Sequence, residues 1–153
     1  MRVSRVIILT VILGFLQITI LDYFKVFSVK PDLILIAVFC AAIFLDLKPA
    51  LCVGLLAGIF KDAFTSSALG FNAVLFPIWV FLIATLIRRV SIEDNISRIA
   101  LLFIVAILNN LISGLALVYS IGSLSWSIFL RITFLASVYT ALIFSLILRI
   151  IKR

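Results

Sequence analysis

The sequence predicts an all-α membrane protein, a six-helix transmembrane bundle formed by a single domain over residues 1–153. Hydrophobic residues make up 66% of the chain and charged residues only 12%, and the mean hydropathy is +1.43. Six apolar runs alternate with short polar breaks. A domain of 153 residues cannot bury this much apolar surface in a core of its own, so the bilayer must be the solvent for most of it.

The second and third apolar runs are short for membrane helices, since about 20 apolar residues are needed to cross a bilayer. Two arrangements remain open for them. They form a re-entrant hairpin, or they are two helices whose ends reach past Pro31 and Asp62. The second arrangement places Lys61 and Asp62 inside the protein, paired or facing a cavity, because lone charges in lipid are costly. The six runs are expected at approximately residues 4–24, 31–46, 49–66, 71–88, 98–119 and 128–149.

Local signals mark where the runs begin and end. Pro31 can open the second helix because its missing N–H would have no partner in a first turn, and Asp32 suits the positive end of the helix dipole. Pro49 opens the third run in the same way. The pair Arg88–Arg89 closes the fourth run, and the uncharged loop 120–127 separates the fifth from the sixth.

Basic residues predict the orientation. With the N-terminus in the cytoplasm and six crossings, nine of the 13 Lys and Arg residues fall on the cytoplasmic side, as the positive-inside rule requires. A re-entrant hairpin in place of the second and third runs keeps the same parity, so both termini are expected in the cytoplasm. The nine residues are Arg2, Arg5, Lys48, Arg88, Arg89, Arg98, Arg149, Lys152 and Arg153.

Charge and composition argue against nucleic-acid binding and against catalysis. The net charge is +7, but the cations stand at helix ends, where they set topology and meet anionic lipid head groups. The chain has no histidine, its six acidic residues are scattered, and it contains no phosphate loop, nucleophile elbow or metal-ligand cluster. No nucleic-acid partner, cofactor, metal or enzymatic activity is therefore expected.

The third run carries the first group of candidate site residues. Gly54 and Gly58 have the small-residue spacing that lets helix backbones approach closely, either within the bundle or at an interface with another protein. Asp62 is a functional candidate if it lies within the membrane and an ordinary surface residue if it lies at the interface. Arg131, near the same side by topology, is a candidate partner for Asp62.

A second group of candidates is polar and lies inside apolar runs. Asn109, Asn110 and Ser113 form a patch in the middle of the fifth run, and Gln17 in the first run is a candidate to meet it. The patch predicts hydrogen bonds between helices or, alternatively, a polar cavity for a small ligand.

Three short motifs resemble the bacterial rod shape-determining protein MreD family. They are Pro31–Leu33 (PDL), Gly54–Asp62 (GLLAGIFKD) and Leu69–Ala73 (LGFNA), in this order and spacing, and chain length, six apolar runs and a basic tail agree. The resemblance makes Pro31, Asp32, Gly54, Gly58 and Asp62 the candidate helix-packing or partner-binding residues. Lys61 departs from the family pattern, since an apolar residue is more usual there.

The resemblance implies a non-catalytic subunit of the cell-elongation (Rod) machinery in the inner membrane. Such a subunit binds an MreC-like protein, works with RodA, a class B penicillin-binding protein and MreB filaments, and helps regulate peptidoglycan synthesis and rod shape. Its fold resembles the substrate-binding S components of energy-coupling-factor transporters.

The alternative function is such an S component itself, binding a vitamin. S components typically carry Ala-x-x-x-Ala on the first helix to dock the coupling subunit, whereas the first run here contains no alanine. A channel or proton-coupled carrier is a third alternative, and it would need more intramembrane charges than Asp62 and Arg131.

Overall fold

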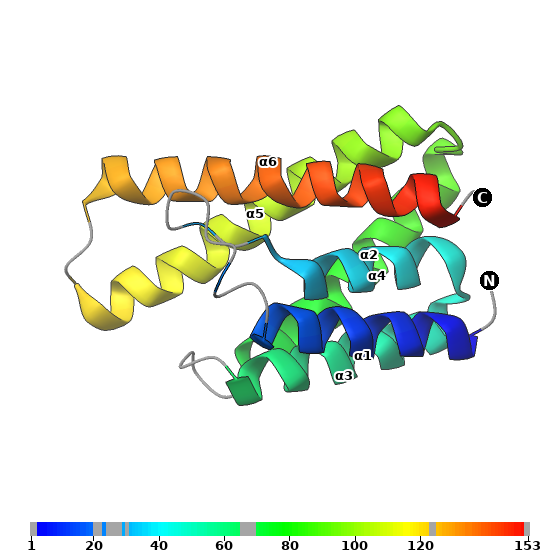
Figure 1. Ribbon diagram of the computed structural model, residues 1–153, viewed down its shortest axis with the longest axis horizontal. Coiled ribbons are helices and arrows are strands. Elements are labelled where there is room, and N and C mark those ends of the chain that lie inside the picture. Colours follow the sequence, from blue (N-terminus) through cyan, green and yellow to red (C-terminus); the bar gives the residue numbers. More distant parts are fainter. Residues whose placement is uncertain are drawn as a thin grey trace. The chain divides into compact units, whose positions relative to one another are not determined.

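The computed structural model describes residues 3–19, 23, 29, 31–64, 70–122 and 125–151. These residues contain six α-helices (Figure 1). This confirms the all-helical class. Apart from the end of α1, every described helix end lies within three residues of the corresponding limit of an apolar run. The helices are α1 (Val3–Thr19), α2 (Leu33–Phe44), α3 (Leu47–Phe64), α4 (Phe71–Val90), α5 (Asn95–Ile121) and α6 (Trp126–Ile151).

Some sequence predictions fall outside the described residues. These are the end of the first run at 20–22 and 24, the end of the third at 65–66, Leu69 of the third motif, and the cations Arg2, Lys25, Lys30, Lys152 and Arg153.

The chain divides into two compact units. The first consists of Met1–Asp22 and Leu33–Ile92 and contains α1 to α4, and the second consists of Tyr23–Asp32 and Glu93–Arg153 and contains α5 and α6. The single domain expected from the sequence stays a prediction.

The first unit is built around α2. This helix is apolar on every side, and each residue from Leu33 to Ala42 is buried. Within the unit it packs against α1, α3 and α4. A helix that is hydrophobic all round needs neighbours on all sides, and this one finds them in protein. At 12 residues it is only about 18 Å long, too short to cross a bilayer of about 30 Å by itself.

Helix α3 begins two residues before the expected third run. It begins at Leu47, so that Pro49 lies in its first turn, where a missing N–H costs no intrahelical bond. Its 18 residues reach Phe64 and include Lys61 and Asp62. The arrangement of two separate helices requires a third helix that continues past Asp62, and α3 does so.

Close contact between α3 and α4 depends on two glycines. Gly54 and Gly58 lie one turn apart on the buried face of α3. A Cβ at Gly58 would lie 2.6 Å from Ala73 Cα and would also collide with the Asn72 carbonyl oxygen. A Cβ at Gly54 would lie 2.9 Å from Val80 Cγ2. The small-residue spacing therefore serves packing within this chain, one of the two uses that the sequence left open.

The second unit is a pair of packed helices, α5 and α6. Gly122 ends α5 with φ of +70°, a left-handed conformation that glycine adopts without steric cost, and its N–H donates to the Val118 carbonyl at 2.8 Å. Only residues 123–125 separate this cap from the start of α6. Phe129 of α6 lies where a side chain on Gly114 of α5 would be.

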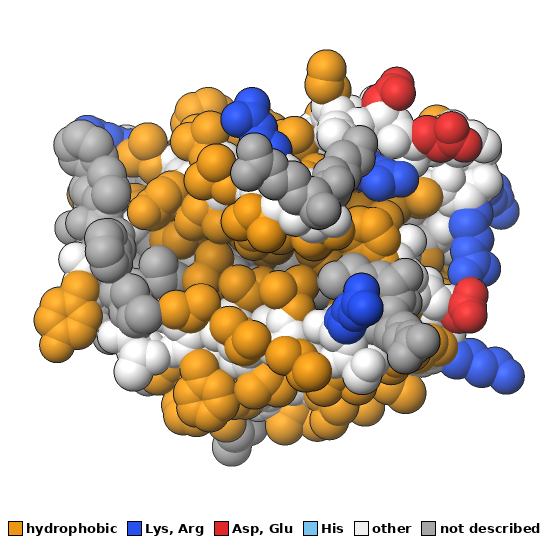
Figure 2. Space-filling model, turned by 45° about the vertical axis from the view of Figure 1, so that its right-hand side comes forward, with side chains coloured by type: hydrophobic (Ala, Val, Ile, Leu, Met, Phe, Trp, Pro, Cys, Tyr) orange, Lys and Arg blue, Asp and Glu red, His pale blue; other side chains and the backbone are white. Residues whose placement is uncertain are grey.

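Within the described residues, three segments are long and apolar enough to cross a membrane: Phe71–Val90, Asn95–Tyr119 and Trp126–Ile151. The α1 and α2 helices are apolar but shorter. Large hydrophobic side chains are exposed on five of the six helices, and they dominate the surface in Figure 2. Such a surface fits a lipid environment and would be a liability in water.

We expect Gly58→Ala to destabilise the protein by about 1–3 kcal/mol, because the new methyl group meets backbone atoms of α4 that cannot move independently. Gly54→Ala is the matched comparison, since its methyl group comes closest to a side-chain atom, Val80 Cγ2, and reaches the α4 backbone only at an ordinary contact distance of 3.5 Å. Thermal unfolding in detergent, followed by circular dichroism, should give a lower midpoint for Gly58→Ala than for Gly54→Ala. Equal midpoints would contradict this account of the packing.

Candidate partner-binding site at the α3–α4 junction

Asp62 is a buried carboxylate that holds the end of α3 against the beginning of α4. Its side chain is only 4% exposed. Oδ1 accepts hydrogen bonds from the Asn72 backbone N–H at 3.1 Å and from Asn72 Nδ2 at 2.7 Å, and Oδ2 accepts from the Ala73 N–H at 3.0 Å. These two backbone N–H groups belong to the first turn of α4, where no helical carbonyl is available to them.

The charge of Asp62 suits this position. The N-terminus of a helix carries a partial positive charge, so a carboxylate beside it is stabilised electrostatically as well as by hydrogen bonds. Hydrogen bonds to an ionised acceptor are stronger than neutral ones, and three of them offset part of the cost of burying the charge. We call Gly58, Asp62, Asn72 and Ala73 the α3–α4 junction.

Gly58 and Asp62 act together at this junction because they lie one turn apart on the same face of α3. The missing side chain at Gly58 lets the backbone of Asn72 and Ala73 approach, and this approach brings their N–H groups within reach of Asp62.

Lys61, the residue before Asp62, contacts an aromatic ring. Its Nζ lies 5.1 Å from the centroid of the Phe76 ring, within the range of a cation–π interaction. Asp62 thus makes the paired contacts that a long third helix was predicted to need. Its observed partners are Asn72 and Ala73, and the predicted pairing with the exposed Arg131 of α6 stays a prediction.

Asn72 is the functional candidate that the sequence analysis did not single out, although it lies in the third motif. The available signal was an amide side chain in the first turn of an apolar run, ten residues after a buried acid. Spacing alone does not indicate that the two side chains meet.

Pro31 and Asp32 lie directly before α2 and are buried. In the second unit, the Asp32 N–H donates to Thr140 Oγ1 at 3.1 Å, and this hydroxyl donates in turn to the Ala136 carbonyl at 2.7 Å. Within the second unit, the backbone at Asp32 is therefore joined to α6.

The predicted polar patch divides between the two units. In the second unit, Asn110 Nδ2 donates to Ser137 Oγ at 3.3 Å, so hydrogen bonding between helices is observed there. Asn109 is fully buried, and Ser113 Oγ is buried without a hydrogen-bond partner in the described part of the chain. In the first unit, Gln17 Oε1 accepts from the Ile34 N–H of α2 at 2.9 Å.

A cavity is present in the first unit, but none of the four residues predicted for a polar cavity lines it. Its lining is almost entirely apolar. The described residues also contain no group of three or more His, Cys, Asp or Glu side chains that could hold a metal ion. What the α3–α4 junction offers chemically is a fixed arrangement of two helices.

No family model, no curated protein and no solved structure matches this chain.

We expect Asp62→Ala to lower the free energy of unfolding by about 3 kcal/mol, because it leaves three donors at the start of α4 without their acceptor. Glu93→Ala removes an exposed carboxylate from the segment between α4 and α5, outside any helix, and its effect should stay below about 0.5 kcal/mol. Unfolding by SDS titration measures both. In a double-mutant cycle, Asp62→Ala and Asn72→Ala should be strongly non-additive, and simple additivity would show that the two side chains do not interact.

Asn110→Ala should have a much smaller effect, about 0.6 kcal/mol, which is typical of a neutral hydrogen bond between membrane helices. The same SDS titration measures it, and Ser137→Ala should add little once Asn110 is gone. If Asn110→Ala lowered the free energy of unfolding as much as Asp62→Ala, the polar patch of α5 and α6 would have a structural role as large as that of the junction.

Proposed function

We propose that this chain is a non-catalytic subunit of the bacterial cell-elongation machinery. It acts in the inner membrane with both termini in the cytoplasm and binds an MreC-like protein. Together with RodA, a class B penicillin-binding protein and MreB filaments, it helps regulate peptidoglycan synthesis and rod shape.

One observation carries the proposal: two of the three motifs behind the family resemblance meet in space. Gly58 and Asp62 come from the second motif, and Asn72 and Ala73 come from the third. The motifs therefore act as one structural unit, which supports treating them as a single signature.

The chemistry of the junction supports a binding role. Both oxygens of Asp62 accept hydrogen bonds from α4, so the carboxylate is engaged in joining two helices. A junction of this kind fixes how α3 and α4 present their outer surfaces. In membranes, where the hydrophobic effect does not drive helices together, partner recognition depends on such preformed shape.

The first test is affinity purification of the tagged protein from gently solubilised native membranes, with identification of the co-eluting proteins by mass spectrometry. Recovery of an MreC-like protein, RodA or a class B penicillin-binding protein would support the proposal. Recovery of paired transporter ATPases with a coupling membrane subunit would overturn it in favour of an S component.

We expect Asp62→Ala to reduce recovery of the MreC-like protein about tenfold, which corresponds to about 1.4 kcal/mol of binding free energy. Leu102→Ala is the matched control, since it removes a fully buried side chain of α5 and should cost about 2–5 kcal/mol of stability while leaving every residue of the junction unchanged. If both variants lose the partner equally, the effect is one of general stability and the junction has no specific role in binding.

A further inference from the structure

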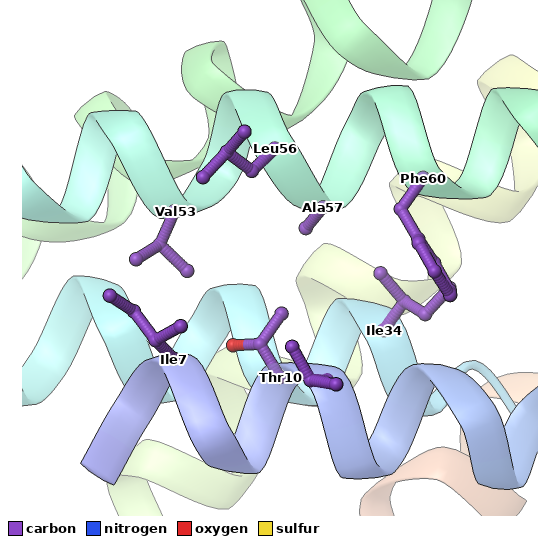
Figure 3. A pocket seen from close by; sticks show the side chains of 8 residues that line it. Ile7, Thr10, Ile34, Val53, Leu56, Ala57 and Phe60 are labelled. Carbon is purple, nitrogen blue, oxygen red and sulfur yellow. The ribbon is translucent and has the colours of Figure 1, made fainter. Parts of the chain in front are cut away.

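A cavity of about 210 Å³ opens between three helices of the first unit (Figure 3). In the close-up, Ile7 and Thr10 on α1 project toward Val53 and Ala57 on α3, and Ile34 of α2 lies at the back. We call it the α1–α3 groove, and its lining residues are Ile7, Thr10, Val11, Ile34, Val53, Leu56, Ala57 and Phe60.

The groove is elongated because α1 and α3 run side by side in the same direction (Figure 1). Ile7 and Val53 line its beginning, and Phe60 lies against Gly14 farther along both helices, where a Cβ on Gly14 would come within 2.7 Å of the ring. Val53 to Phe60 is two helical turns, or about 11 Å. The hydrocarbon region of one leaflet is about 15 Å deep, half of the 30 Å core, so the groove matches most of the depth of one acyl chain.

The lining requires an apolar occupant. Thr10 is the polar member of the set, and its hydroxyl donates to the Val6 carbonyl at 2.8 Å, so its donor is already used. The rim is open, since Ile7, Val11 and Leu56 are 42%, 47% and 60% exposed. A molecule from the surrounding hydrocarbon can therefore enter from the side.

Charge at one end of the groove favours a negatively charged head group. Arg5 and Lys48 are exposed near the beginnings of α1 and α3, the end of the groove that Ile7 and Val53 line. Asp46 is also exposed there, which leaves this end with a net positive charge. Basic residues near a membrane surface attract anionic lipids by about 1 kcal/mol each.

From these observations we infer that the α1–α3 groove binds one acyl chain of an anionic phospholipid, whose phosphate lies near Arg5 and Lys48. The inference rests on a membrane location and is independent of the elongation-complex proposal. A helix of a partner protein fits the groove less well, because one side chain of a packed helix fills a hole between four residues, whereas this groove runs for two turns between three helices.

The test uses the full-length protein, purified in mild detergent and titrated with phosphatidylglycerol or phosphatidylcholine, with bound lipid counted by native mass spectrometry. The wild type should bind one phosphatidylglycerol more tightly than any further copies. Ala57→Leu fills the groove and should abolish this tight binding. Val11→Phe blocks the rim from an exposed position and gives the same readout even if Ala57→Leu fails to fold. Leu142→Phe, on the exposed surface of α6, should bind lipid as the wild type does.

The charges are tested separately. The double variant Arg5→Gln, Lys48→Gln should weaken phosphatidylglycerol binding about fivefold per charge removed and leave phosphatidylcholine binding unchanged. The inference is overturned if the wild type binds no lipid tightly, or if it binds phosphatidylcholine as tightly as phosphatidylglycerol. It is also overturned if Val11→Phe binds phosphatidylglycerol as the wild type does, or if a polypeptide occupies the groove in place of lipid. None of these results bears on recovery of an MreC-like protein, so the two proposals fail separately.

Discussion

The arrangement of the first unit depends on how the first N–H groups of α4 are satisfied where water is scarce. A helix beginning in a protein interior or in hydrocarbon has donors with no helical acceptor, and each one left alone is costly. Asp62 solves this by supplying both carboxylate oxygens to Asn72 and Ala73. The solution works only if the backbones touch, which is why a glycine at position 58 is as necessary as the acid.

The same arrangement recurs at the beginning of α2. The Ile34 N–H in the first turn of this helix donates to the Gln17 side chain of α1. Here too a polar side chain from another helix accepts the hydrogen bond. Gln17 and Asp62, two polar residues inside apolar runs, thus share a physical role, since each accepts a hydrogen bond from the first turn of another helix.

Helix positions could be predicted because they depend on local patterns. Apolar runs, prolines at position 31 and 49 and the Arg88–Arg89 pair mark boundaries that lie close to those observed. The pairing of polar groups could not be predicted, because it depends on which helices become neighbours. The cost of a lone charge in lipid indicated that Asp62 needs a partner. It did not point to Asn72, whose amide lies within reach only after α3 and α4 have packed.

Use of the polar groups for holding helices together constrains how this protein can recognise anything else. The Asp62 carboxylate, the Thr10 hydroxyl and the Gln17 carbonyl all have partners within the first unit, so they are poorly placed to receive a polar ligand without a loss of stability. What its helices present outward is mainly apolar shape, with cations such as Arg5, Lys48 and Arg88 exposed at their ends. Recognition by such a surface must come from close packing of helices or acyl chains and from attraction to anionic head groups.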